Sequence, residues 1–190
     1  CGIGGTEEVL PHPLGDERRE GREAQGDHAQ SLVEGGERRR IAVPEAPACA
    51  ADVPIRQVVD EGRDQGVQEL VLDIRYNGGG LLALASQLGY MVAGPNVIQN
   101  RIFEKTSFND KYPNTDPVTG RALQPMPFYN RGIDYQQGQF TNQTLPNLTL
   151  KRVFVLTTGR TCSASEAVMN GLRGVDLEVI QIGNKTCGKP

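Results

Sequence analysis

The chain has 190 residues and a formal net charge of −3, and this length allows one sizeable hydrophobic core. Because nucleic-acid-binding domains carry clustered basic residues, the acidic balance disfavours a nucleic-acid partner. No apolar run approaches the roughly 18 residues that a membrane-spanning helix requires, so we expect no membrane span.

The first 53 residues differ in composition from the remainder of the chain. All ten aromatic residues lie at or after Tyr76, whereas the first 50 residues consist mostly of Glu, Arg, Gly, Ala and Pro. Such a stretch buries too little apolar surface to offset the entropy lost on ordering. We therefore expect residues 1–53 to form a disordered or non-native leader, and residues 54–190 to form the folded core.

Hydrophobic periodicity predicts the elements that follow the leader. In chain order the pattern predicts a helix over 54–66, a buried strand over 67–74, a glycine-rich turn over 75–80, a helix over 81–94, a strand over 96–103, a strand over 151–158, a helix from Ser163 to Gly174 and a strand over 177–183. Strands alternating with helices in this way favour an α/β fold with a largely parallel sheet.

Residues 104–150 interrupt this alternation. They are rich in Pro, Asn, Asp, Gly and aromatic residues and have little periodicity. The segment is longer than an ordinary connection. We expect an extended loop or lid over a site, with a surface insertion as the alternative.

Three segments that could carry chemistry each follow a predicted strand: the glycine turn 77–80, Ser163 and Lys189. In a parallel sheet these segments meet at the carboxyl ends of the strands, where sites collect. A serine at a helix N-terminus lies among free N–H groups, so the amide of Ala164 and one from the glycine turn could stabilise an oxyanion. The only histidines, His12 and His28, lie in the leader. A desolvated Lys189 is then the candidate base.

The ending Gly-Asn-Lys-Thr-Cys-Gly-Lys-Pro also resembles the phosphate-binding loop G-x-x-x-x-G-K-[ST]. Pro190 stands where that loop needs a Ser or Thr for magnesium. We therefore expect no nucleotide.

Taken together, three ordered segments resemble the C-terminal processing peptidases, also called tail-specific proteases. That family carries D-L-R-x-N-x-G-G, S-A-S-E and G-x-x-T-x-G-K segments, which match 73–80, 163–166 and 183–189. The resemblance covers roughly 55–103 and 150–190. It implies a serine peptidase with a Ser-Lys dyad, on a fold related to the crotonase and caseinolytic-protease sheet, acting on a polypeptide substrate without a cofactor.

The resemblance also implies roles for single residues. It makes Ser163 the nucleophile and Lys189 the general base, with Gly79 and Ala164 forming the oxyanion hole. Ser165, the second serine of the motif, is the rival nucleophile. The supporting residues that it implies are Gly78, Gly80, Asn77 and Arg75 around the turn and Glu166 as the helix cap.

Two features depart from the family. No PDZ module is recognisable in residues 1–54, and the sequence stops one residue after Lys189, where the family continues with a strand. A catalytic domain truncated at its C-terminus is therefore expected. A non-catalytic polypeptide-binding relative is the first alternative, and a crotonase-like acyl-CoA enzyme is the second. A homo-oligomer is left open.

The cysteines give a further expectation. Cys162 precedes the expected nucleophile and Cys187 lies two residues before the expected base, so the two are neighbours if the dyad forms. They form either a disulfide, which suits an oxidising periplasm or other extracytoplasmic site, or two free thiols. Cys1 followed by Gly-Ile-Gly-Gly leaves a lipid anchor open. No C-x-x-C pair is present, so no metal site is predicted.

Overall fold

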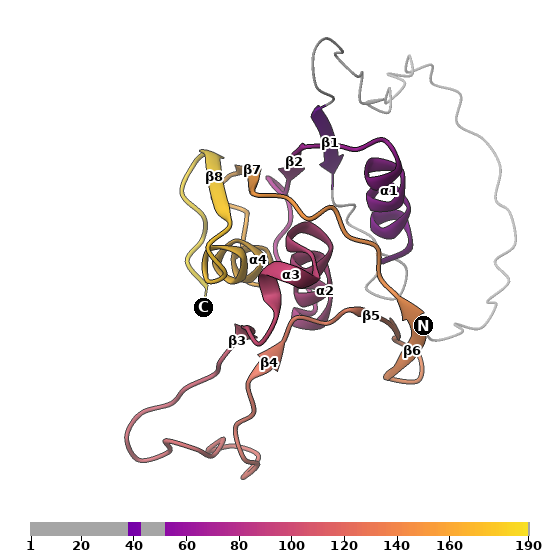
Figure 1. Ribbon diagram of the computed structural model, residues 1–190. Coiled ribbons are helices and arrows are strands. Elements are labelled where there is room, and N and C mark those ends of the chain that lie inside the picture. Colours follow the sequence, from indigo (N-terminus) through magenta and orange to yellow (C-terminus); the bar gives the residue numbers. More distant parts are fainter. Residues whose placement is uncertain (1–37, 43–51, 190) are drawn as a thin grey trace, which may run out of the picture. The chain divides into compact units, whose positions relative to one another are not determined.

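The computed structural model of the protein describes residues 38–42 and 52–189, with side chains described from Ile55 onward (Figure 1). All of these residues belong to one structural unit, Leu32–Pro190. The elements in chain order are β1 (Arg38–Ala42), α1 (Asp52–Asp64), β2 (Glu69–Asp73), α2 (Leu82–Ala93), α3 (Pro95–Ile98), β3 (Ile102–Glu104), β4 (Met126–Pro127), β5 (Arg131–Asp134), β6 (Gln139–Thr144), β7 (Arg152–Thr157), α4 (Ala164–Arg173) and β8 (Glu178–Gly183).

A four-stranded sheet of order β1-β2-β7-β8 organises the fold, and every neighbouring pair in it is parallel. This confirms the predicted α/β class with a parallel sheet. The carboxyl ends of β2, β7 and β8 lie at one edge, because the register places Leu156 of β7 opposite both Asp73 and Ile182. That edge positions the candidate site.

The leader prediction is wrong for one segment. Residues Arg38–Ala42 form β1, which pairs in parallel with Glu69–Asp73. Composition missed this strand because an edge strand is held by main-chain hydrogen bonds to its neighbour, which do not need apolar side chains. The rest of the leader, including Cys1, lies outside the described residues, apart from the first residues of α1, which begins at Asp52.

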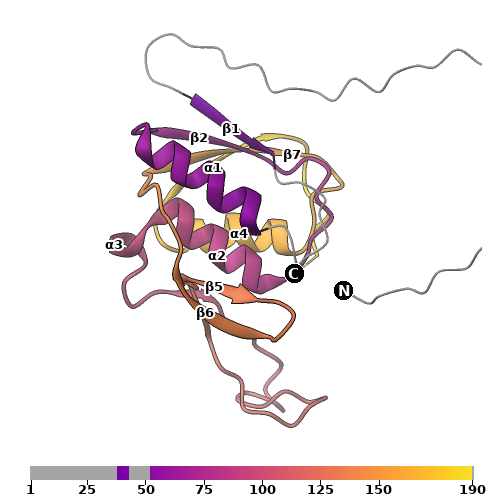
Figure 2. The same cartoon turned by 90° about the vertical axis from the view of Figure 1, so that its right-hand side faces the viewer.

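The hydrophobic core lies between the sheet and its helices. Leu72 of β2 and Val153 and Val155 of β7 are completely buried, and Figure 2 shows α1, α2 and α4 on one side of the sheet. In α2 every residue from Ala85 to Ala93 is buried, so this part of the helix is covered on all sides. Buried apolar area of this kind supplies most of the folding free energy.

The polar residues buried in α2 explain how residues 104–150 are attached. Ser86 Oγ donates to the carbonyl of Pro127 at 2.8 Å and accepts the N–H of Tyr129 at 2.8 Å. Gln87 Nε2 donates to the carbonyl of Arg131 at 2.7 Å. The segment contains the short strand β4 and the β5–β6 hairpin. Side chains of α2 bind the main chain of both.

The strand predicted over 96–103 is largely wrong. Gly94 has φ +77° and Pro95 occupies the first turn of α3, a favoured place for proline. Asn100, with φ +59°, turns the chain again, and the strand β3 is limited to Ile102–Glu104. The alternating apolar residues therefore belong to two short elements.

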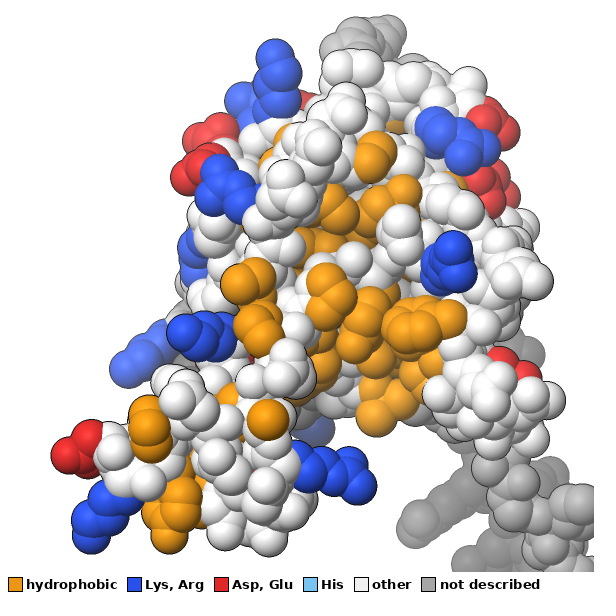
Figure 3. All heavy atoms as spheres, turned by 60° about the horizontal axis from the view of Figure 1, so that its bottom comes forward, with side chains coloured by type: hydrophobic (Ala, Val, Ile, Leu, Met, Phe, Trp, Pro, Cys, Tyr) orange, Lys and Arg blue, Asp and Glu red, His pale blue; other side chains and the backbone are white. Residues whose placement is uncertain are grey.

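Part of the apolar surface remains exposed in the described part of the chain. Figure 3 shows the face that comes forward when the bottom of Figure 1 is turned toward the viewer, with apolar side chains gathered at its centre. Large exposed apolar residues include Leu81, Ile102 and Phe140. The helices of the described residues are all too short or too polar to cross a membrane.

Candidate active site

The three segments singled out in the sequence meet at the carboxyl edge of the sheet. The turn 77–80 follows β2, Ser163 follows β7 and Lys189 follows β8. The N–H of Cys162 donates to the carbonyl of Asn77 at 3.2 Å, and the N–H of Cys187 donates to the carbonyl of Thr161 at 3.0 Å. The turn after β7 is therefore bonded to the segments on both of its sides.

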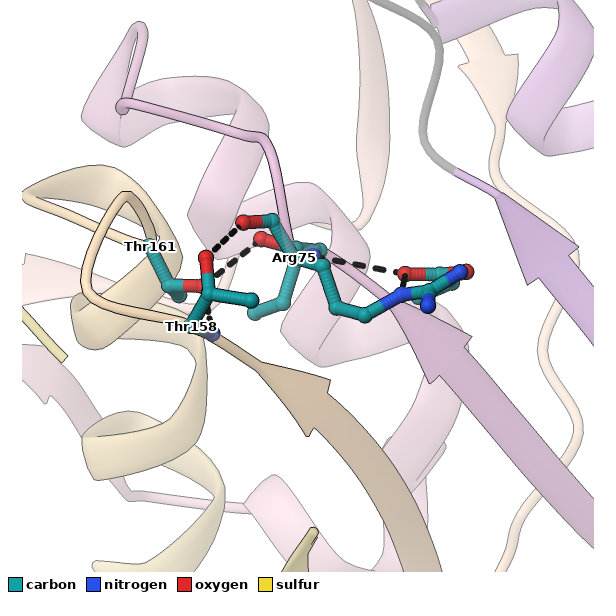
Figure 4. A network of polar contacts seen from close by, with 5 residues as sticks. Arg75, Thr158 and Thr161 are labelled. Atoms are coloured by element: carbon teal, nitrogen blue, oxygen red, sulfur yellow. Dashed lines mark hydrogen bonds and ion pairs between the residues drawn. The ribbon is translucent and has the colours of Figure 1, made fainter. Parts of the chain in front are cut away.

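Two threonines that follow β7 form hydrogen bonds to the residues that follow β2 (Figure 4). The buried Thr161 hydroxyl donates to the carbonyl of Ile74 at 2.8 Å and accepts the N–H of Thr158 at 3.0 Å. The Thr158 hydroxyl in turn donates to the carbonyl of Arg75. The Arg75 side chain is fixed by Asp73, to which its Nε and Nη2 donate at 2.9 and 2.8 Å. Sequence reasoning missed both threonines, because a hydroxyl that binds a distant carbonyl leaves no periodic pattern.

Asn77 holds the glycine turn in shape and ties it to α4. Its Oδ1 accepts the N–H of Gly79 at 3.0 Å and the hydroxyl of Ser165 at 2.9 Å. Ser165 is only 5% exposed. The hydroxyl of the rival nucleophile is therefore buried and already engaged as a link between the turn and the helix.

Ser163 has the most unusual backbone of the site. It is the N-cap of α4 with φ 56° and ψ −119°, a combination that non-glycine residues rarely adopt and that costs of the order of 1–3 kcal/mol. A sharp turn of this kind between a strand and a helix presents a serine Oγ outward in hydrolases. Ala164 is the first helical residue, so its N–H has no acceptor within the helix.

The glycine turn lies directly against Ser163. A Cβ built on Gly79 would lie 2.8 Å from Ser163 Cβ and 3.3 Å from its Oγ, and Gly79 has φ +124°. A Cβ on Gly78 or Gly80 would meet nothing within 4 Å. The close approach therefore requires glycine at position 79 in particular, although the N–H of Gly79 points to Asn77 in this structure.

Lys189 is brought to the same place but is exposed. The sequence predicted a lysine desolvated by apolar neighbours, and this is not observed. The preceding residues, Lys185 to Gly188, are small or polar and mostly exposed themselves, so they give the side chain little cover. The backbone N–H of Lys189 donates to Glu166 Oε2 at 3.0 Å.

Glu166 accepts hydrogen bonds from both sides of the site. Its Oε2 accepts the N–H of Ser163 at 2.8 Å, the bond expected of a helix cap. Its Oε1 accepts the Thr186 hydroxyl at 2.7 Å and the Gly188 N–H at 2.8 Å. Burial alone would raise the pKa of the Glu166 carboxyl. The hydrogen bonds from Thr186, Ser163, Gly188 and Lys189 outweigh it and hold the pKa below its ordinary value.

A disulfide joins Cys162 to Cys187, with their Cα atoms 5.2 Å apart. It crosses from the residue before Ser163 to the residue two before Lys189. Both sulfurs lie close to Glu166. A sulfur in a disulfide is no thiolate, so these three residues do not make a metal site in this state.

Comparisons with known proteins show which proteins the chain resembles. The model of peptidase family S41 matches residues 42–190. An S41 protease from Bacteroides fragilis is 29% identical to the chain with a TM-score of 0.62, and the match covers 84% of this chain and 38% of that protein. The chain thus spans well under half the length of that relative. Among curated proteins, none matches the sequence.

Two further solved structures are more distant. A lipoprotein from Streptococcus agalactiae is 17% identical with a TM-score of 0.51, covering 84% of this chain and 50% of that one, and so shares the fold. A photosystem II D1 C-terminal processing protease is 23% identical with a TM-score of 0.42, covering 85% of this chain and 35% of that protein.

Proposed function

Because the chain belongs to peptidase family S41, we propose that it is the catalytic core of a serine endopeptidase with Ser163 as nucleophile and Lys189 as general base. One observation carries the proposal. Ser163 has a rare backbone conformation at the start of α4. It lies so close to Gly79 that any side chain at position 79 would displace it. Strain of this kind, held in place by its surroundings, is typical of functional positions.

The proposed reaction follows from the groups at this edge. Ser163 Oγ attacks the carbonyl carbon of the peptide bond while the neutral Lys189 amine takes its proton. The lysine then gives that proton to the departing amine, and water hydrolyses the acyl-enzyme by the same route.

The oxyanion of the tetrahedral intermediate needs donors, and Ala164 N–H is the first. The positive end of the α4 dipole adds to it. In this proposal the second donor is the N–H of Gly79, which has to leave Asn77 Oδ1, its present acceptor. Substrate binding would supply the competing acceptor.

The substrate and location are also proposals. The disulfide beside the dyad favours an oxidising, extracytoplasmic compartment such as a periplasm, with or without a lipid anchor. We propose the C-terminal tails of proteins in that compartment as substrates. The exposure of Lys189 favours one alternative, in which the chain binds polypeptide without cleaving it.

A serine-directed fluorophosphonate probe tests the dyad. The probe is allowed to react from about pH 6 to pH 9 and read by intact mass. We expect labelling of the wild type, loss of labelling in Ser163→Ala and Lys189→Ala, and retained labelling in Ser165→Ala. A folded wild type that is not labelled would instead support the binding alternative.

A further inference from the structure

We infer that Glu166 is a positioning residue for the proposed reaction, which fastens the lysine-bearing segment 186–189 to the turn that carries Ser163. The inference rests on the proposed function for its catalytic part. Its structural part rests on contacts alone.

The first argument is the number and origin of the donors. A helix cap needs only the bond from Ser163 N–H, yet Glu166 accepts three more, from Thr186, Gly188 and Lys189. These three come from a segment at least 20 residues further along the chain. Hydrogen bonds to an ionised acceptor are about twice as strong as neutral ones, so this carboxylate binds the segment firmly.

The second argument is which atoms share an acceptor. Oε2 accepts both the N–H of Ser163 at 2.8 Å and the N–H of Lys189 at 3.0 Å. One oxygen atom thus fixes the backbone of the expected nucleophile and of the expected base together. A misplacement of reacting groups by about 1 Å can cost on the order of 100-fold in rate, so this shared acceptor matters for catalysis.

The third argument is that only a carboxylate suits the position. Glu166 is 9% exposed, and a buried charge is tolerated only when it is well paired. All four of its partners are donors. A glutamine would turn its NH2 group either toward the N–H groups of Ser163 and Lys189 or toward the Gly188 N–H and the Thr186 hydroxyl, so at least one backbone N–H would lose its acceptor.

The disulfide does not make Glu166 redundant. It fixes the position of Cys187, whereas Glu166 binds the two residues that follow it, Gly188 and Lys189. The Glu166 carboxylate therefore positions the backbone between the disulfide and the expected base.

Amide hydrogen exchange tests the contact without any need for activity. In the wild type the amides of Gly188 and Lys189 should be protected, and Glu166→Gln, which keeps only one acceptor oxygen, should speed the exchange of at least one of them about tenfold, as expected for loss of a bond to a charged acceptor. Amides at the centre of β7 should not change. Glu178→Gln, which alters an exposed carboxylate on β8, is the matched control and should leave these amides unchanged. Unchanged exchange of Gly188 and Lys189 in Glu166→Gln would overturn the inference.

A double-mutant cycle tests the catalytic part. We expect Glu166→Gln to slow labelling of Ser163 by about 10- to 100-fold, and Lys189→Ala to cost much less in that background than in the wild type. Thr186→Val removes one donor and should act in the same direction more weakly, which keeps the test usable if Glu166→Gln does not fold. An equal cost of Lys189→Ala in both backgrounds would overturn the positioning role. A wild type that is not labelled would remove the proposed function, and the exchange data alone would then decide the contact.

Discussion

The disulfide between Cys162 and Cys187 should stabilise the fold by constraining the unfolded chain. The two cysteines are 25 residues apart in sequence. The loop-closure relation for a loop of this length gives roughly 3.5 kcal/mol at 25 °C. For urea slopes of about 1–3 kcal/mol/M, this free energy corresponds to a shift in the unfolding midpoint of about 1.2–3.5 M.

The test compares the oxidised wild type with Cys162→Ala/Cys187→Ala in urea, followed by far-UV circular dichroism. Both proteins carry alanine at positions 1 and 49, so that no other cysteine contributes. A reductant should lower the midpoint of the wild type to that of the variant and leave the variant unchanged. A difference below about 1 kcal/mol would refute the loop-entropy reasoning, since native contacts then compensate for it. Alkylation of both thiols without reductant would refute the disulfide.

Three other predictions concern single residues of the site. Gly79→Ala should reduce probe labelling at least about 100-fold, because its Cβ would lie 2.8 Å from Ser163 Cβ; Gly80→Ala, which also has a positive φ of 153° but whose Cβ meets open space, is the control, and equal labelling of the two variants would contradict the close approach. Ser165→Ala should keep its labelling but lose about 1 kcal/mol of unfolding free energy with its hydrogen bonds; lost labelling in a folded variant would make Ser165 the nucleophile. Because the pKa of Glu166 is lowered on folding, its stabilisation should be complete above the ordinary carboxyl value of about 4.3 and lost as pH falls through the lower folded value. Urea midpoints of the wild type and Glu166→Gln should therefore differ at pH 7 and converge in acid, and a constant difference would refute the assignment.

The sequence alone determined the α/β class and the place of the site. Apolar periodicity reports which side chains face a core, so the strands around Leu72 and Val155 were predicted correctly. Once those strands are parallel, chain order alone sends Asn77, Ser163 and Lys189 to one edge of the sheet. Local pattern and topology were sufficient for that much.

Only the tertiary structure shows which of two similar, closely spaced residues has which role in the site. Both serines of the S-A-S-E segment look alike in sequence, and the structure separates them by the rare backbone conformation of Ser163 and by the bond from the buried Ser165 to Asn77. Likewise, the contact with Ser163 that makes glycine necessary at position 79 is absent at both adjacent glycines. No sequence pattern indicates that Glu166 also binds the segment 186–189. These facts depend on hydrogen bonds and contacts between residues far apart in the chain, whose geometry exists only after the sheet has brought the segments together.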